Sequence, residues 1–122
     1  MYKILVVDDE LDVCDFVKHF FEERNYSVTT ALNGDEAVRI VAKYKFDVIL
    51  LDIKMKAMDG IETLRRIKQV DKDAKVIMVT AIEDEDKMVM ACKLGACRYI
   101  TKPLVLEELE NAVYENTKGS KK

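Results

Sequence analysis

The stretch Phe46-Asp47-Val48-Ile49-Leu50-Leu51-Asp52 is an apolar run that ends in a carboxylate, and the turn residues Met58-Asp59-Gly60 follow it. Its apolar residues do not alternate with polar ones, a pattern typical of a strand buried on both faces. Ligands of open α/β sheets bind at the edge where such strands end. Asp52 is therefore the first candidate for a functional residue, and its meaning depends on what the other strands place beside it.

Length and composition indicate one ordinary globular domain. The chain has 122 residues, of which 49% are hydrophobic and 35% charged, enough to bury a single core. No apolar run approaches the ~20 residues of a membrane span, and the N-terminus shows no signal peptide, so we expect no membrane association and a cytoplasmic location. The net charge of −3 offers no basic surface, so direct nucleic acid binding is not expected.

The cysteines indicate a chain without disulfides. Cys14, Cys92 and Cys97 are an odd number with no C-x-x-C spacing. Each lies in a helical or strand pattern, so we interpret them as small buried residues rather than metal ligands or redox centres. This usage is typical of a reducing compartment.

Apolar strands alternate with amphipathic helices along the whole chain. In the first helix, Val13, Phe16, Val17 and Phe20 have the spacing of a buried face. Asn33 with Glu36 predicts a helix start, and Gly95 a left-handed helix end. The resulting fold class is α/β, a (βα)₅ doubly wound, three-layer sandwich with a five-stranded parallel sheet. Strands are predicted at 4–7, 26–31, 46–52, 76–79 and 98–101, each followed by a helix, the fourth helix opening at the acidic run 83–86.

Polar side chains follow four of the predicted strands. Asp8 and Asp9 follow the first, Asp52 ends the third, Thr80 follows the fourth, and Lys102 follows the fifth. In a parallel sheet these ends meet at one edge. Three acids close together raise at least one pKa unless a cation neutralises them. Oxygen ligands with room for water suit Mg²⁺, so the sequence predicts a magnesium site there.

The same edge has the groups that phosphoryl chemistry requires. A divalent cation, a lysine and a hydroxyl stabilise a dianionic phosphoryl group, and a carboxylate beside them can attack phosphorus. Asp52, alone on its strand, is the better nucleophile, and the adjacent pair Asp8 and Asp9 the better metal ligands. Taken without the other residues, that pair could instead cap the first helix.

These residues resemble the response-regulator receiver domain (CheY-like) of two-component signalling. The resemblance covers residues 2 to about 116 and implies the flavodoxin-like strand order 2-1-3-4-5. The motifs that carry it are Asp8-Asp9, Leu50-Leu51-Asp52 with Met58-Asp59-Gly60, Thr80-Ala81, Gly95-Ala96, and Tyr99 before Lys102-Pro103.

The resemblance implies a metal-dependent phosphoacceptor. Asp52 would take a phosphoryl group from a phosphohistidine on a sensor histidine kinase or a histidine phosphotransfer protein. Asp8 (through water), Asp9, Asp52 and the backbone carbonyl of Lys54 would hold Mg²⁺, with Mn²⁺ as an alternative.

The resemblance also implies a conformational switch. Thr80 and Lys102 would each contact a phosphoryl oxygen, Tyr99 would rotate inward when Thr80 moves, and the Lys102-Pro103 bond would be cis. The surface of the fourth helix, fifth strand and fifth helix would then bind an output protein or domain, or form a homodimer. Such a chain is a signalling switch and not an enzyme, apart from weak autodephosphorylation. We expect residues 1–117 to form the receiver domain and residues 118–122 a disordered tail or linker stub.

Two residues of the loop after Asp52 are notable. Lys56 stands where the family usually has proline, so a stiff φ is lost. Lys54 places a cationic side chain beside the expected phosphoryl site, and we hypothesise that it shields an acyl phosphate from water.

Other functions remain open at this level. A flavodoxin-like cofactor binder needs a phosphate-cradling loop, whereas the first strand here ends in Asp8-Asp9-Glu10. A haloacid-dehalogenase-type phosphatase needs a second acid two residues after the nucleophile, where Lys54 stands. Within the receiver interpretation, the chain could be a complete regulator or part of a longer one.

Overall fold

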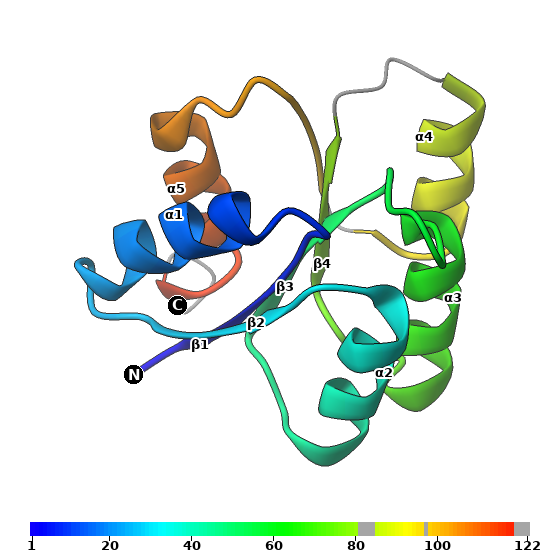
Figure 1. Ribbon diagram of the computed structural model, residues 1–122, viewed down its shortest axis with the longest axis horizontal. Coiled ribbons are helices and arrows are strands. Elements are labelled where there is room, and N and C mark those ends of the chain that lie inside the picture. Colours follow the sequence, from blue (N-terminus) through cyan, green and yellow to red (C-terminus); the bar gives the residue numbers. More distant parts are fainter. Residues whose placement is uncertain (81–84, 97, 119–122) are drawn as a thin grey trace.

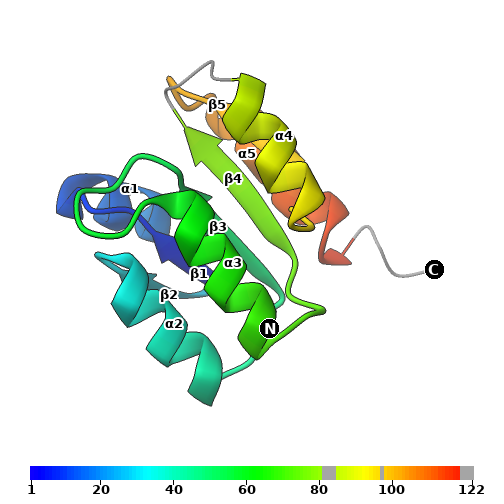
Figure 2. The ribbon, with the colours of Figure 1, turned by 90° about the vertical axis from the view of Figure 1, so that its right-hand side faces the viewer.

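A five-stranded parallel sheet lies between two layers of helices in the computed structural model, which describes residues 1–80, 85–96 and 98–118 (Figures 1 and 2). The strand order is β2-β1-β3-β4-β5, so the predicted doubly wound α/β fold and its strand order are confirmed. The strands are β1 (Lys3–Val7), β2 (Ser27–Ala31), β3 (Val48–Asp52), β4 (Val76–Thr80) and β5 (Arg98–Thr101). The helices are α1 (Leu11–Glu22), α2 (Gly34–Lys43), α3 (Gly60–Val70), α4 (Glu85–Lys93) and α5 (Leu106–Glu115).

The register of the sheet brings the carboxyl ends of the central strands together. Leu51 of β3 lies opposite Val7 of β1, and Asp52 lies opposite Val79 of β4. Thr80 in turn lies opposite Thr101 of β5. The residues that end or follow these strands therefore share one edge of the sheet.

The strands bury both of their faces, which explains why their sequences do not alternate. In Figure 1, α1 and α5 cover one face and α2, α3 and α4 the other. Alternate residues of β3 point to opposite layers, Ile49 and Leu51 to one core and Val48 and Leu50 to the other. Every residue of β3 and β4 is buried. This double burial holds the carboxyl ends of the strands in fixed positions.

Local capping sets the helix ends, at Asn33 and Gly95 as predicted and also at Asp59. The Asn33 side chain accepts a hydrogen bond of 2.8 Å from the Glu36 N–H at the start of α2, and Asp59 does the same for Glu62 at α3 with 2.9 Å. Gly95, with a φ of 97°, follows α4 in the left-handed conformation that glycine adopts without a steric penalty. Of the acidic run expected to open α4, residues 83 and 84 lie outside the described residues.

Two expectations about side-chain burial are wrong. Phe16 is 55% exposed, because the buried face of α1 is centred on Cys14, Val17 and Phe21 instead. Cys92 is exposed on α4, whereas Cys14 is buried as expected. Cys97 lies outside the described residues. The spacing of apolar residues alone did not decide which of several neighbouring residues on these helices face the core.

The packed chain extends slightly beyond α5. The Thr117 hydroxyl donates a 2.7 Å hydrogen bond to the Val113 carbonyl, and it lies 3.4 Å from the Tyr26 hydroxyl. Thr117 is buried, and Lys118 next to it is exposed. Over the part of the chain that the structure describes, none of the helices combines the length and apolarity needed to cross a membrane.

Gly60 allows α3 to begin directly against the end of β3. A Cβ atom on Gly60 would lie 2.2 Å from the Asp52 carbonyl oxygen and 2.4 Å from the Ile53 Cα. The Gly60 N–H also donates a 2.6 Å hydrogen bond to the Ile53 carbonyl. Both neighbours are backbone atoms that cannot rotate away, so this close approach requires glycine.

We expect Gly60→Ala to lower the free energy of unfolding by about 2 kcal/mol or more, since overpacking against backbone forces β3 and α3 apart. Urea unfolding would measure the change. Gln69→Ala, on the exposed side of α3, is the control and should change stability by less than about 0.5 kcal/mol. Equal stability of Gly60→Ala and wild type would contradict the steric argument.

Candidate functional site

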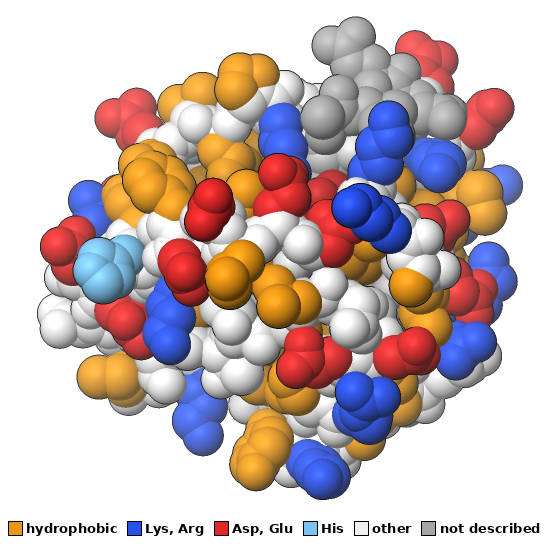
Figure 3. All heavy atoms as spheres, in the orientation of Figure 1, with side chains coloured by type: hydrophobic (Ala, Val, Ile, Leu, Met, Phe, Trp, Pro, Cys, Tyr) orange, Lys and Arg blue, Asp and Glu red, His pale blue; other side chains and the backbone are white. Residues whose placement is uncertain are grey.

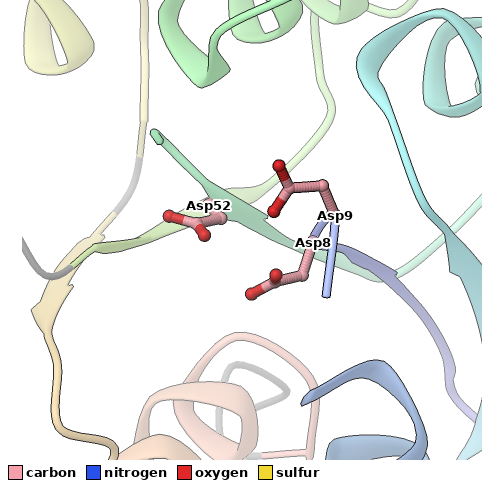
Figure 4. Close-up of side chains that lie close together, drawn as sticks. All are labelled: Asp8, Asp9 and Asp52. Atoms are coloured by element: carbon pink, nitrogen blue, oxygen red, sulfur yellow. The ribbon is translucent and has the colours of Figure 1, made fainter. Parts of the chain in front are cut away.

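Three carboxylates meet at the carboxyl edge of the sheet. Asp8 and Asp9 follow β1 and Asp52 ends β3, and one oxygen of each lies within 4.8 Å of the others. Figure 4 shows the three side chains converging on one small volume. Asp8 and Asp52 are buried, and Asp9 is half-buried. The structure thus brings together the acids that the sequence placed at this edge.

Lys102 forms ion pairs with two of these acids. Its ammonium nitrogen lies 3.1 Å from Asp52 Oδ2 and 3.3 Å from Asp8 Oδ2, and its side chain is 19% exposed. The residue follows β5, and its N–H donates a 2.6 Å hydrogen bond to the Thr80 carbonyl. The Lys102-Pro103 peptide bond is cis. A cation from one edge strand is therefore delivered to acids on two inner strands.

Each carboxylate also accepts one backbone N–H. Asp8 accepts from Glu10 at 2.9 Å, and Asp52 accepts from Lys54 at 3.1 Å. Asp9 accepts from Lys56 at 3.1 Å. The N-cap residue of α1 is Glu10, with no side-chain cap, so the structure does not support capping of α1 as the function of the acid pair.

Burial governs the ionisation of this cluster. It raises the pKa of Asp52 above its ordinary value, with a further increase from Asp8, although the Lys102 ammonium and the Lys54 N–H act in the opposite direction. Burial lowers the pKa of Lys102, but the charges of Asp52 and Asp8 outweigh it and raise the pKa overall. Lys102 is therefore charged at neutral pH, and it supplies one positive charge beside three carboxyl groups.

Thr80 and Tyr99 occupy neighbouring strands. Thr80 ends β4 and is fully buried, so its side chain belongs to the same edge as Asp52. Tyr99 is half-buried and packs against the core that α2, α3 and α4 cover. It lies opposite Met78 in the sheet register, two positions before the Thr80–Thr101 pair. Thr80 is thus at the acidic edge, and Tyr99 lies on the neighbouring strand β5, two register positions before that edge.

The loop between β3 and α3 takes a larger part in the site than the sequence indicated. Lys54 and Lys56 both have exposed side chains, but their N–H groups bind Asp52 and Asp9. The contact between Lys56 and Asp9 spans 47 positions in the chain. Backbone donors carry no residue signature, and for this reason sequence patterns could not have revealed it.

The arrangement suits a divalent cation and an anionic substrate. Clustered carboxylate oxygens are the donors that Mg²⁺ prefers, and the excess negative charge favours a bound cation. The Lys102 ammonium at the same edge can pair with a phosphoryl oxygen. On the face of the molecule that Figure 3 shows, basic side chains are interspersed with acidic and apolar ones.

Comparison with known proteins identifies the class. Residues 4–114 match the model of the response regulator receiver domain, and the chain belongs to this family. It is 38% identical to sporulation initiation phosphotransferase F of Bacillus subtilis, over 91% of this chain and 90% of that protein. It is 39% identical to the transcriptional regulatory protein ZraR of Klebsiella oxytoca, over 92% of this chain but 25% of that protein.

A solved structure agrees with the fold. The response regulator TrrA of Thermotoga maritima, in complex with Mg²⁺ and BeF, superposes with a TM-score of 0.86 at 33% identity, covering 95% of this chain and 99% of that one. Receiver domains are phosphoacceptor switches of two-component signalling that bind Mg²⁺ at an acidic pocket. The chain is thus a receiver domain, a signalling switch rather than an enzyme with turnover.

The raised pKa of Asp52 predicts how stability depends on pH in protein freed of divalent metal. Between the unfolded and folded pKa values the native state binds more protons than the unfolded chain, so the free energy of unfolding falls as pH rises through that window. Asp52→Asn removes this penalty. We expect it to be more stable than wild type at pH 7.

Urea unfolding in the presence of chelator, at pH values from neutral down to the ordinary aspartate pKa of 3.8, measures the difference. The difference in the free energy of unfolding between Asp52→Asn and wild type should become smaller as the pH falls. Asp73→Asn, at an exposed position, should follow wild type throughout. A less stable Asp52→Asn protein at pH 7 would show that the ion pair with Lys102 outweighs burial.

Proposed function

We propose that this chain accepts a phosphoryl group on Asp52 and that the phosphorylated form switches the surface of α4, β5 and α5. The observation that carries this proposal is the meeting of Asp8, Asp9 and Asp52 with the Lys102 ammonium at one edge of the sheet. Family membership favours it over the cofactor-binding and phosphatase alternatives.

The donor is a phosphohistidine on a sensor histidine kinase or a histidine phosphotransfer protein. An Asp52 oxygen attacks phosphorus, the P–N bond to the imidazole breaks, and the imidazole leaves with the electron pair. The product is an acyl phosphate. Lys102 pairs with one phosphoryl oxygen and the Thr80 hydroxyl donates to another, which offsets the charge that builds up on phosphorus. Slow hydrolysis of the acyl phosphate, an autodephosphorylation, resets the switch.

Mg²⁺ fits the acidic cluster, with Mn²⁺ as the alternative of similar chemistry. Asp9 and Asp52 would bind it directly, Asp8 through water, and Lys54 through its backbone carbonyl. When bound, the cation neutralises the carboxylates and the incoming phosphoryl oxygens. Lys102 supplies one positive charge beside three carboxyl groups, which supports the need for a bound divalent cation.

The output surface lies beside the acidic edge rather than at it. Phosphorylation adds about −1.5 to −2 charge at a site that Thr80 adjoins, and a shift of Thr80 leaves room for Tyr99 to turn inward. Val89 and Met90 of α4 are 51% and 42% exposed, apolar groups available to a partner. We propose an output protein or domain, or a homodimer, as the occupant.

We propose that residues 1–117 comprise the receiver domain; of the tail or linker predicted at 118–122, residues 119–122 lie outside the described residues. The burial of Thr117 and the exposure of Lys118 support this boundary. The relatives include chains of nearly this length and regulators four times longer, so both a single-domain regulator and part of a longer protein are compatible with the family.

Incubation with Mg²⁺ and acetyl phosphate should add the mass of one phosphoryl group, measured by intact-protein mass spectrometry. The adduct should be absent from Asp52→Asn, which has no nucleophilic carboxylate at the site, and chelator should abolish it.

Asp73→Asn is the matched control, since it removes one exposed carboxylate and should be phosphorylated like wild type. An adduct that persists in Asp52→Asn would place the phosphoacceptor at another residue.

Lys54 supplies a second test. Its side chain is exposed while its N–H binds Asp52, so the ammonium is well placed to shield an acyl phosphate from water. We expect Lys54→Ala to shorten the phosphoryl half-life several-fold. The half-life is measured from the loss of the phosphoryl adduct over time by intact-protein mass spectrometry. Lys43→Ala, an exposed lysine at the end of α2, should leave the half-life unchanged. Equal half-lives of Lys54→Ala and wild type would refute the shielding.

A further inference from the structure

Asp9 differs from the other two acids in how it is held. Asp8 and Asp52 each use Oδ1 for the N–H two residues further along the chain and Oδ2 for Lys102. These two acids are therefore oriented by N–H groups close to them in the chain and by one shared cation. Asp9 instead accepts from Lys56, and among the described residues this is its one hydrogen bond.

One carboxylate oxygen of Asp9 belongs to the acidic cluster. Lys56 N–H binds Oδ2, which leaves the capacity of Oδ1 for another partner. Figure 4 shows one oxygen of Asp9 turned towards Asp8 and Asp52 and the other turned away from them. A half-buried carboxylate with one such contact can rotate, so its orientation depends on whether the loop between β3 and α3 holds it.

We propose that the Lys56 N–H is a positioning group for the metal site, which holds Asp9 in the orientation that binds a divalent cation. The inference rests on the proposed Mg²⁺ site and goes beyond it by linking the metal to the loop that contains residues 53–59. Hydrogen bonds to the outer oxygen or nitrogen of a ligand fix its orientation and commonly account for 10- to 100-fold in metal affinity.

The link operates in both directions. If the ordered loop strengthens cation binding through Asp9, the bound cation must strengthen the ordered loop by the same factor. The loop also starts at Asp52 and carries the Lys54 N–H that binds it. Binding of the metal therefore prepares the backbone around the proposed phosphoacceptor before any phosphoryl group arrives.

This contact depends on residue 56 having an N–H. Proline, which the family resemblance implies at this position, lacks the donor. The chain therefore contains an interaction with Asp9 that a proline-bearing sequence cannot form. The Lys56 side chain is exposed, so its charge and length are not part of the positioning role, and alanine can substitute for it.

The test compares Mg²⁺ affinity, measured by calorimetric titration with MgCl₂, in proteins with and without the donor. Lys56→Pro should raise the dissociation constant about tenfold or more. Lys56→Ala retains the N–H and should stay within about twofold of wild type.

Amide hydrogen exchange in metal-free protein measures the protection that the hydrogen bond from the Lys56 N–H to Asp9 gives without a bound cation. The Lys56 amide should exchange several-fold faster in Asp9→Ala than in wild type, whereas the Lys54 amide, which binds Asp52, should not change. In wild type, added Mg²⁺ should slow exchange at Lys56. This second readout decides the question if Lys56→Pro does not fold.

The outcomes separate the positioning role from the metal site itself. Absence of Mg²⁺ binding by wild type would overturn the proposed site and this inference with it. Mg²⁺ binding by wild type with an equal affinity in Lys56→Pro, or an unchanged Lys56 exchange rate in Asp9→Ala, would overturn the positioning role alone.

Discussion

The ion pairs of Lys102 with Asp8 and Asp52, at 3.3 and 3.1 Å, compensate part of the negative charge at the acidic edge, and the rest of the site depends on this compensation. Two buried carboxylates and a third at their side cannot share so small a volume without compensation. The Lys102 ammonium compensates part of that negative charge. The part that is not compensated favours binding of a cation and disfavours the charged form of Asp52 in its absence. The affinity of the acidic cluster for a cation and the cost to folding stability of the buried Asp52 carboxylate thus have the same electrostatic origin.

The fold meets this constraint by delivering each group from a separate strand. Asp8 and Asp9 arrive from β1, Asp52 from β3, Thr80 from β4 and Lys102 from the end of β5. Because both faces of β3 and β4 are buried, these ends move little. The two hydrogen bonds from the Lys54 and Lys56 N–H groups connect the loop between β3 and α3 to the acids.

The same geometry separates chemistry from output. The acidic edge is common to a family whose members include a phosphotransferase and transcriptional regulators. The output surface that we propose, on α4, β5 and α5, is separate from the acidic cluster, because β5 lies two strands from β3 in the sheet, and its exposed apolar residues can vary without changing the charges of the cluster. Partner choice can therefore change while the site is maintained.

The amino-acid sequence determined the order of strands and helices, the capping at Asn33 and Gly95, and the candidates at the sheet edge, because these follow from local periodicity and residue type. It could not determine that Phe16 and Cys92 are exposed, since helix rotation depends on packing across the sheet. It also could not show that Lys56 holds Asp9. Only the tertiary structure decided that contact, because a backbone N–H has no residue signature and its partner lies 47 positions away.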